Sequence, residues 1–201
     1  HVPAPGYLEG VRKLCDKYGA LLIFDEIQCG MGRTGELFAY QYYKVQPDIA
    51  TLAKGLGGGV PMGAFMTTDK IAAAFTAGDH GTTFGGNPLV CAASLAVFKA
   101  IDEEHILDNA KKVGDYMKAQ LLELKKAYPK LIKEVRGEGL MLGAELTKPG
   151  REIVEACLNK GVIINCTAGN VLRFVPPLII TESHVDEVMT VLKEVLQSEP
   201  A

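Results

Sequence analysis

The sequence lacks the cysteine spacing of a disulfide framework or a zinc site. Its five cysteines are an odd number and include no C-x-x-C pair; they are Cys15, Cys29, Cys91, Cys157 and Cys166. Scattered thiols of this kind are typical of a protein in a reducing compartment. We therefore expect free thiols, a cytoplasmic location and no metal site.

Excess charge, long apolar runs and targeting signals are also missing. The net charge is −3 over 201 residues, which gives no electrostatic attraction to nucleic acid or to an anionic membrane. No apolar stretch has the length of a transmembrane helix, and no secretory signal peptide is recognisable. We therefore expect neither nucleic acid nor a membrane among the partners.

An initiator methionine is absent as well. The chain opens with His1-Val2-Pro3-Ala4-Pro5 and leads at once into a helical pattern. This beginning predicts that an N-terminal part of the polypeptide is missing from the sequence. A functional site can then be divided between the two parts.

Apolar periodicity in the first half predicts alternating helices and strands. The predicted helices are residues 6–17, 36–43 and 88 to beyond 101, and the predicted strands are residues 21–24, 49–53 and 62–67. Asn87 followed by Pro88 is a strong helix start, because Asn caps and Pro suits the first helical position. The alternation indicates an α/β domain with a mostly parallel sheet, whose first two strands are buried on both faces.

The pattern changes in the second half of the chain. The predicted strands are residues 132–136, 140–146, 162–165 and 172–175, and the predicted helices are residues 107–127, 151–159 and 183–196. This mixture indicates a smaller α+β unit. We place the boundary in the long helical connection, so that residues 1–105 belong to a large domain and residues 106–201 form a small C-terminal domain.

Lys54 stands between an apolar strand and a glycine-rich turn, and Asp25 ends the preceding apolar strand. Ligands of α/β sheets bind beyond the carboxyl ends of the strands, so Asp25 and Lys54 are expected to face one pocket. Lysine can serve there as a fixed cation for phosphate or as an amine that attacks a carbonyl. Asp25 can instead be a structural acid that bonds to nearby loop amides.

The segment from Leu21 to Glu26 also resembles a Walker B strand, in which the acid holds Mg²⁺ and the next Glu activates water. That site requires a G-x-x-x-x-G-K-[ST] loop, and none is present because Lys54 precedes its glycines. An ATPase of this type is therefore a remote alternative.

A third element lies in residues 79–88, where Thr82, Thr83 and three glycines precede the helix start. Main-chain amides and the helix dipole suit such a place to phosphate. An amine, an acid and a phosphate cradle are together what pyridoxal 5'-phosphate requires.

These residues resemble the class III aminotransferases of pyridoxal-phosphate fold type I. The motifs that match in order and spacing are Asp25-Glu26-Ile27-Gln28, Gly32-Arg33-Thr34-Gly35, Pro47-Asp48-Ile49, Ala53-Lys54-Gly55, Thr82-Thr83-Phe84-Gly85-Gly86-Asn87-Pro88-Leu89, Val135-Arg136-Gly137 and Leu172-Arg173-Phe174-Val175-Pro176-Pro177-Leu178. The similarity covers essentially the whole chain. It implies the C-terminal part of a large, mostly parallel-sheet domain, followed by a small α+β domain.

The resemblance implies a role for each matching residue. Lys54 corresponds to the lysine that binds the cofactor covalently and moves a proton, and Asp25 to the acid that keeps the pyridine nitrogen protonated. Gln28 corresponds to the residue beside the phenolic oxygen. Thr83 corresponds to the threonine that reaches the cofactor phosphate of the neighbouring subunit, and Arg173 to the arginine that holds the substrate carboxylate. The plainer alternatives are a loop cap for Gln28, a turn residue for Thr83 and a rim charge for Arg173.

Within the class, three segments resemble the members that act on N2-acetylornithine more than those that act on ornithine or 4-aminobutyrate; they are residues 37–40, 53–59 and 80–84. The implied reaction is transamination with 2-oxoglutarate, giving N-acetylglutamate semialdehyde and glutamate in arginine biosynthesis, by a homodimer with shared sites. The alternatives are an ornithine or succinyldiaminopimelate aminotransferase, an aminomutase or decarboxylase, and a non-catalytic fragment. The last remains open because the family's phosphate loop, ring-stacking aromatic and second substrate arginine would precede His1.

Overall fold

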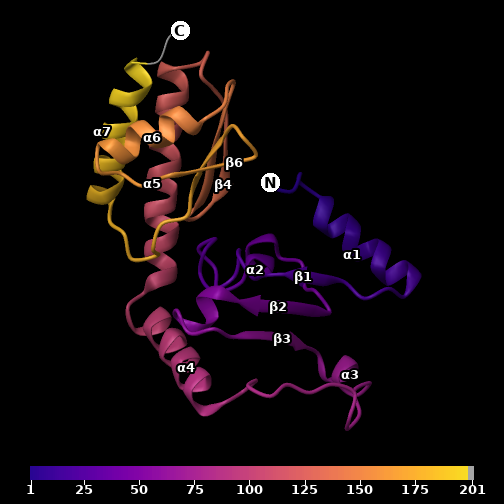
Figure 1. Cartoon of the computed structure of the whole chain (residues 1–201). Coiled ribbons are helices and arrows are strands. Elements are labelled where there is room, and N and C mark those ends of the chain that lie inside the picture. Colours follow the sequence, from indigo (N-terminus) through magenta and orange to yellow (C-terminus); the bar gives the residue numbers. More distant parts are fainter. Residues whose placement is uncertain (199–201) are drawn as a thin grey trace. The chain divides into compact units, whose positions relative to one another are not determined.

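The computed structural model of the chain describes residues 1–198 (Figure 1). The chain divides into two compact units, Pro3–Leu107 and the part from Asp108 onward, which also takes in His1 and Val2. Each unit has its own β-sheet. None of the helices in residues 1–198 combines the length and apolar character that a membrane crossing demands.

The first unit contains a small mixed sheet, and helices alternate with its strands in the sequence. Its elements are α1 (Tyr7–Tyr18), β1 (Ile23–Asp25), α2 (Ala39–Tyr43), β2 (Ile49–Ala53), the 3₁₀ helix η1 (Lys54–Gly57), β3 (Gly63–Thr67), α3 (Asp69–Ala72) and α4 (Pro88–Glu103). The strand order is β1-β2-β3, with β1 parallel and β3 antiparallel to β2. The predicted strand 49–53 is confirmed, and the helix start at Asn87 is confirmed by its side chain, which accepts the Val90 amide at 3.2 Å.

The prediction that the first strand is buried on both faces is wrong for this chain. Ile23 is 56% exposed and the preceding Leu21 is 55% exposed. The described residues leave these two side chains uncovered, and β1 pairs only with β2 among them. In β2, by contrast, Ala50 and Leu52 are buried and alternate with half-buried neighbours.

The second unit packs three helices on an antiparallel sheet. Its elements are α5 (Ile106–Ala127), whose first two residues belong to the first unit, β4 (Ile132–Glu138), β5 (Met141–Leu146), α6 (Arg151–Asn159), β6 (Asn165–Thr167), β7 (Val171–Phe174) and α7 (Glu182–Ser198). The strand order is β4-β5-β7-β6. One hydrophobic cluster joins the sheet to the helices, with Leu121 of α5, Leu142 of β5, Ile153 of α6, Leu172 of β7 and Leu192 of α7 almost fully buried.

The predicted strand 162–165 is wrong, because pairing with β7 begins only at Asn165. Val162 instead closes the end of α6, where its amide donates to the carbonyl oxygen of Cys157 at 3.0 Å. Ile163 is 86% exposed, so its apolar character does not mark a buried strand.

Helix α5 and the β4–β5 hairpin approach each other at two glycines. A Cβ atom on Gly114 would lie 2.4 Å from the carbonyl carbon and oxygen of Gly139. Main-chain atoms cannot move aside as a flexible side chain can, so this contact requires glycine at position 114.

Candidate active site

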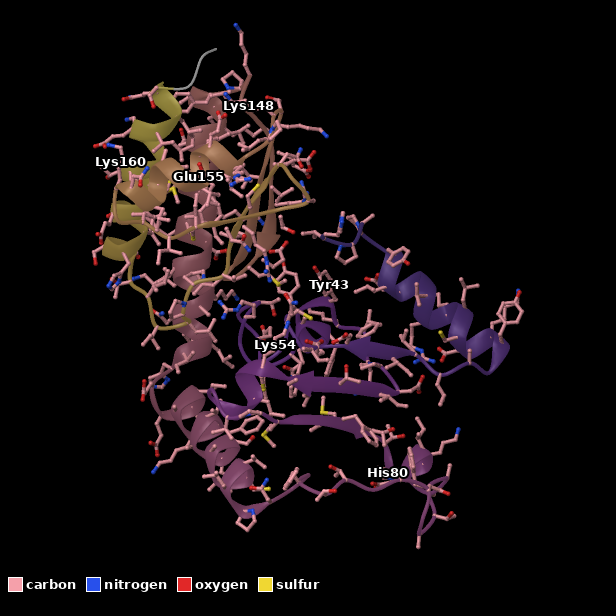
Figure 2. All side chains as sticks on the ribbon, in the orientation of Figure 1. Tyr43, Lys54, His80, Lys148, Glu155 and Lys160 are labelled. Atoms are coloured by element: carbon pink, nitrogen blue, oxygen red, sulfur yellow. The ribbon has the colours of Figure 1, made fainter. Side chains whose placement is uncertain are left out.

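Asp25 and Lys54 lie at the carboxyl ends of neighbouring parallel strands. Asp25 is the last residue of β1 and is paired with Thr51 of β2, and Lys54 follows three residues beyond that partner (Figure 2). With about 3.3 Å per residue along a strand, this offset is about 10 Å along the sheet. The two side chains therefore start from one edge of the sheet.

Lys54 is held in an unusual backbone conformation. Its φ angle is 49°, in the left-handed region that non-glycine residues seldom adopt. Its side chain is exposed, and within residues 1–198 it makes no hydrogen bond or ion pair. A strained, unpaired lysine at the end of a strand is the kind of outlier that concentrates at functional sites.

The carboxylate of Asp25 has one oxygen engaged by the protein. Oδ1 accepts the amide of Ile27 at 2.9 Å and the hydroxyl of Thr51 at 3.3 Å. Within the described residues Oδ2 has no partner. This oxygen is the one that can accept a hydrogen bond from a cationic ring nitrogen.

Glu26, which follows Asp25, is buried and binds main-chain amides at the start of α2. Its side chain is only 2% exposed, and its two carboxylate oxygens accept the amides of Ala39 at 2.9 Å and Tyr40 at 2.8 Å. These amides belong to the first turn of α2, where unpaired N–H groups favour an anion. The helix therefore begins at Ala39, later than the predicted residue 36.

This contact argues against the Walker B alternative. In that reading the Glu after the strand must activate a water molecule. Glu26 instead directs its carboxylate to the main chain of α2, in a buried position.

The thiol of Cys29 packs beside the same carboxylate. Its Sγ–H lies 3.4 Å from Oε2 of Glu26. Burial, followed by the negative charge of Glu26, raises the pKa of the Cys29 thiol to about 12. Cys29 is therefore protonated at neutral pH and is a poor nucleophile.

Gln28 lies on the turn that connects Asp25 to the following loop. The turn closes where the amide of Gly30 donates to the carbonyl oxygen of Glu26 at 2.9 Å. A Cβ on Gly30 would lie 2.7 Å from that same oxygen, so the turn requires glycine. The turn keeps Gln28 exposed, three residues beyond Asp25.

The structure distinguishes the two threonines of the third sequence element. The Thr82 hydroxyl accepts the amide of Gly85 at 3.2 Å, which makes Thr82 a turn residue. The hydroxyl of Thr83 makes no hydrogen bond within the described residues and is exposed. Thr83 is thus the better candidate for a phosphate ligand.

Thr83 lies at the opposite end of α4 from the lysine. Helix α4 packs on η1 near Val97, whose Cγ2 would lie 2.8 Å from a Cβ on Gly58. Thr83 precedes Pro88 at the start of the helix, which is about 14 Å from Val97 along the axis. The chain brings Asp25 and Lys54 to one edge of the sheet, and Thr83 precedes the end of α4 that is distant from the contact with η1.

His80 has a structural environment. Its ring packs against Phe75 and Phe65, with centroid distances of 5.8 and 6.2 Å. Figure 2 shows His80 beside α3, far from Lys54.

Arg173 belongs to the second unit, on β7. It lies opposite Gly143 of β5 and Asn165 of β6, so the three residues share the face of the sheet that is turned away from the hydrophobic core. On the same face Arg136 of β4 forms ion pairs with Glu145 at 2.6 Å and Glu134 at 2.8 Å. Arg173 is half-buried on this face.

The donor set fits pyridoxal phosphate. Lys54 offers an unpaired amine, Asp25 offers one unpaired carboxylate oxygen, and Thr83 offers an unpaired hydroxyl for a phosphate. Sequence reasoning missed Glu26 and Thr51, because their partners are set by pairings between separate segments.

Comparisons with known proteins point in one direction. Residues 1–196 match the family model described as aminotransferase class-III. The acetylornithine aminotransferase of Methanocaldococcus jannaschii is 53% identical over 97% of this chain and 49% of its own length. Ornithine aminotransferase 1 of Staphylococcus saprophyticus is 43% identical over 98% of this chain and 50% of its own length. The match to a solved structure of the Toxoplasma gondii ornithine aminotransferase has a TM-score of 0.91 and 36% sequence identity. It covers 97% of this chain and 47% of that chain. That structure is described as having partial occupancy of PLP at its active site.

Proposed function

The chain belongs to the class III aminotransferases, and from that premise we propose that it carries the lysine-bearing part of a pyridoxal-phosphate site that transaminates N2-acetylornithine with 2-oxoglutarate. It spans about half the length of the curated relatives it matches. The observation that carries the proposal is the placement of Asp25 and Lys54 at the ends of paired parallel strands.

Two residues have the central roles. When bound, pyridoxal phosphate supplies a carbonyl group and an electron-withdrawing ring. Lys54 would hold the cofactor through its Nζ atom, and the freed amine would serve as the base that moves a proton. The carboxylate of Asp25 would keep the ring nitrogen protonated, because a negative charge beside a nitrogen base favours the protonated form.

The remaining site residues bind and orient. Gln28, three residues beyond Asp25, would bind beside the phenolic oxygen of the ring. The hydroxyl of Thr83 would donate to the phosphate in the site of a second subunit. Arg173 holds the substrate α-carboxylate through two parallel hydrogen bonds.

The amine donor is assigned from the relatives. The relative named for acetylornithine is 53% identical, whereas the relative named for ornithine is 43% identical. Ornithine is therefore the second candidate donor. Succinyldiaminopimelate, an aminomutase reaction and a non-catalytic role for the isolated chain remain alternatives.

The organisation of the whole protein follows from the same proposal. We assign residues 1–105 to a large cofactor-binding domain and residues 106–201, of which 199–201 lie outside the described residues, to a small C-terminal domain. A homodimer is expected, because Thr83 would complete the partner's site. The free cysteines fit a cytoplasmic location.

A half-reaction screen tests this function. The complete polypeptide that contains this chain is loaded with pyridoxal phosphate and mixed with N2-acetylornithine, ornithine, succinyldiaminopimelate or 4-aminobutyrate, each in turn. We expect N2-acetylornithine to bleach the visible cofactor band most rapidly and 2-oxoglutarate to restore it. A faster reaction with another donor would reassign the substrate, and the absence of any band would remove the function.

Titration of the isolated 201-residue chain with the cofactor addresses the fragment alternative. We expect weak or absent uptake of the cofactor, because a single chain is proposed to lack some of the residues that bind the cofactor phosphate. Tight stoichiometric uptake would contradict the alternative that the isolated chain is a non-catalytic fragment.

A further inference from the structure

The carboxylate of Asp25 is held from two sides by groups with no assigned role. Its Oδ1 atom accepts the amide of Ile27 at 2.9 Å and the hydroxyl of Thr51 at 3.3 Å. Asp25 and Thr51 are paired across parallel strands, so their side chains lie on the same face of the sheet. Both contacts engage Oδ1, and this arrangement leaves Oδ2 for a ligand.

Glu26 fixes the turn that presents the Ile27 amide. Glu26 is 2% exposed, and its carboxylate accepts the amides of Ala39 and Tyr40 at 2.9 and 2.8 Å. Its own amide donates to the carbonyl oxygen of Thr51 at 3.0 Å. Glu26 therefore ties the end of β1 to α2 through its side chain and to β2 through its main chain.

We propose that Thr51 and Glu26 are positioning residues that orient Oδ2 of Asp25 toward the ring nitrogen of pyridoxal phosphate. The inference rests on the proposed function and deepens it. Thr51 acts through a hydrogen bond to Asp25, and Glu26 acts through the turn that holds the Ile27 amide. A carboxylate that turns away from the nitrogen stabilises its proton less, so the bound cofactor titrates at a lower pH and binds less tightly.

The experiment compares Thr51→Val and Thr51→Ser in the complete holoenzyme that contains this chain. Val removes the hydroxyl and keeps the β-branched shape and the main-chain acceptor for Glu26. We expect the Kd of the cofactor-free protein for pyridoxal phosphate, measured by fluorescence titration, to rise about three- to tenfold in Thr51→Val. The pH dependence of the visible band should shift in the same variant, and Thr51→Ser should retain both wild-type values.

Glu26→Gln is the second arm of the test. Gln offers one acceptor oxygen to two amides, so the turn is loosened and the pH dependence should shift in the same direction. The thermal midpoint of the cofactor-free variant separately measures its loss of stability. A variant that loses stability but keeps the wild-type pH dependence would overturn the assignment of Glu26.

Wild-type affinity and pH dependence in Thr51→Val would overturn the assignment of Thr51. A wild-type protein that binds no cofactor would overturn the proposed function, and the inference with it. The two failures are therefore distinguished by the wild-type titration alone.

Discussion

Lys54 and Lys44 share a left-handed backbone and an exposed side chain, with φ angles of 49° and 55°. Only Lys54 directly follows a strand of the sheet, since Lys44 ends the short helix α2. The difference in placement makes Lys44 a matched control for the chemistry assigned to Lys54.

We expect Lys54→Ala in the complete polypeptide to lose the borohydride-reducible cofactor adduct and the visible band. Turnover should fall by at least about 10²-fold, because a positioned base that moves a proton is removed. Lys44→Ala should keep the adduct and the rate. Adduct formation at the wild-type level in Lys54→Ala, measured by mass spectrometry after reduction, would show that another amine binds the cofactor.

Arg173→Lys should weaken carboxylate binding, since Lys cannot provide the planar pair of donors of a guanidinium. We expect KM for 2-oxoglutarate to rise about tenfold or more, the loss typical of a hydrogen bond to a charged group, in steady-state assays. The control is Arg151→Lys, at a side chain that is 88% exposed in its ion pair with Glu155. Equal KM values for the two variants would place Arg173 outside the substrate site.

Cys29 should resist alkylation at pH 8. Its pKa of about 12 leaves only about one thiol in ten thousand ionised at that pH. We expect iodoacetamide to modify the exposed Cys91 at least about 100-fold faster in the isolated chain, as measured by peptide mass spectrometry. Both should react at similar rates in 8 M urea, roughly the concentration that unfolds small domains. Rapid native modification of Cys29 would contradict the buried contact with Glu26.

Asp48 should stabilise the first unit in a pH-dependent way. Its carboxylate accepts the amide of Leu22 at 2.7 Å and pairs with Arg12 at 2.7 Å, and these contacts lower the pKa of Asp48. A lowered pKa in the folded state means that the contribution is present above the ordinary carboxyl pKa of about 4 and is lost as the pH falls through the lower folded value.

We therefore expect Asp48→Asn to lower the free energy of unfolding at pH 7 by about 1.5–3 kcal/mol, and to weaken the dependence of that energy on pH below about 4. Asp16→Asn removes the more exposed partner of Arg12 and should cost at most about 1 kcal/mol. Urea unfolding of the isolated chain at several pH values measures both. An equal loss in the two variants would contradict the role of the Leu22 contact.

Gly114→Ala should destabilise the second unit, because the new Cβ overlaps the main chain of Gly139. We expect a cost of about 1–3 kcal/mol, typical of overpacking. Gly10→Ala is the contrasting change: Gly10 is also within a helix, but its added Cβ meets nothing within 4 Å. It should stabilise by about 0.5–1 kcal/mol through helix propensity, and a thermal melt that shows the same sign for both would contradict the close approach.

Local patterns in the sequence were sufficient for most of the elements. The predicted helix 151–159 matches α6 and the predicted strand 49–53 matches β2, because the spacing of apolar residues records which face of each segment is buried. The start of α4 at Pro88 followed from capping by Asn87, a contact between residues three apart. The order of Asp25 and Lys54 at strand ends was also visible in the sequence, since a parallel sheet gathers those ends at one edge.

The tertiary structure decided what depends on pairing between distant segments. The sequence shows Glu26 as an acid after a strand, and only the approach of α2, thirteen residues later, makes it a buried helix cap. The hydroxyl of Thr51 meets Asp25 because β1 and β2 pair in one particular register. Apolar periodicity is a local signal, so the position of Lys54 after a strand could be predicted from the sequence. The partner of a hydrogen bond depends on the path of the chain, so the contacts of Thr51 and Glu26 around Asp25 could not.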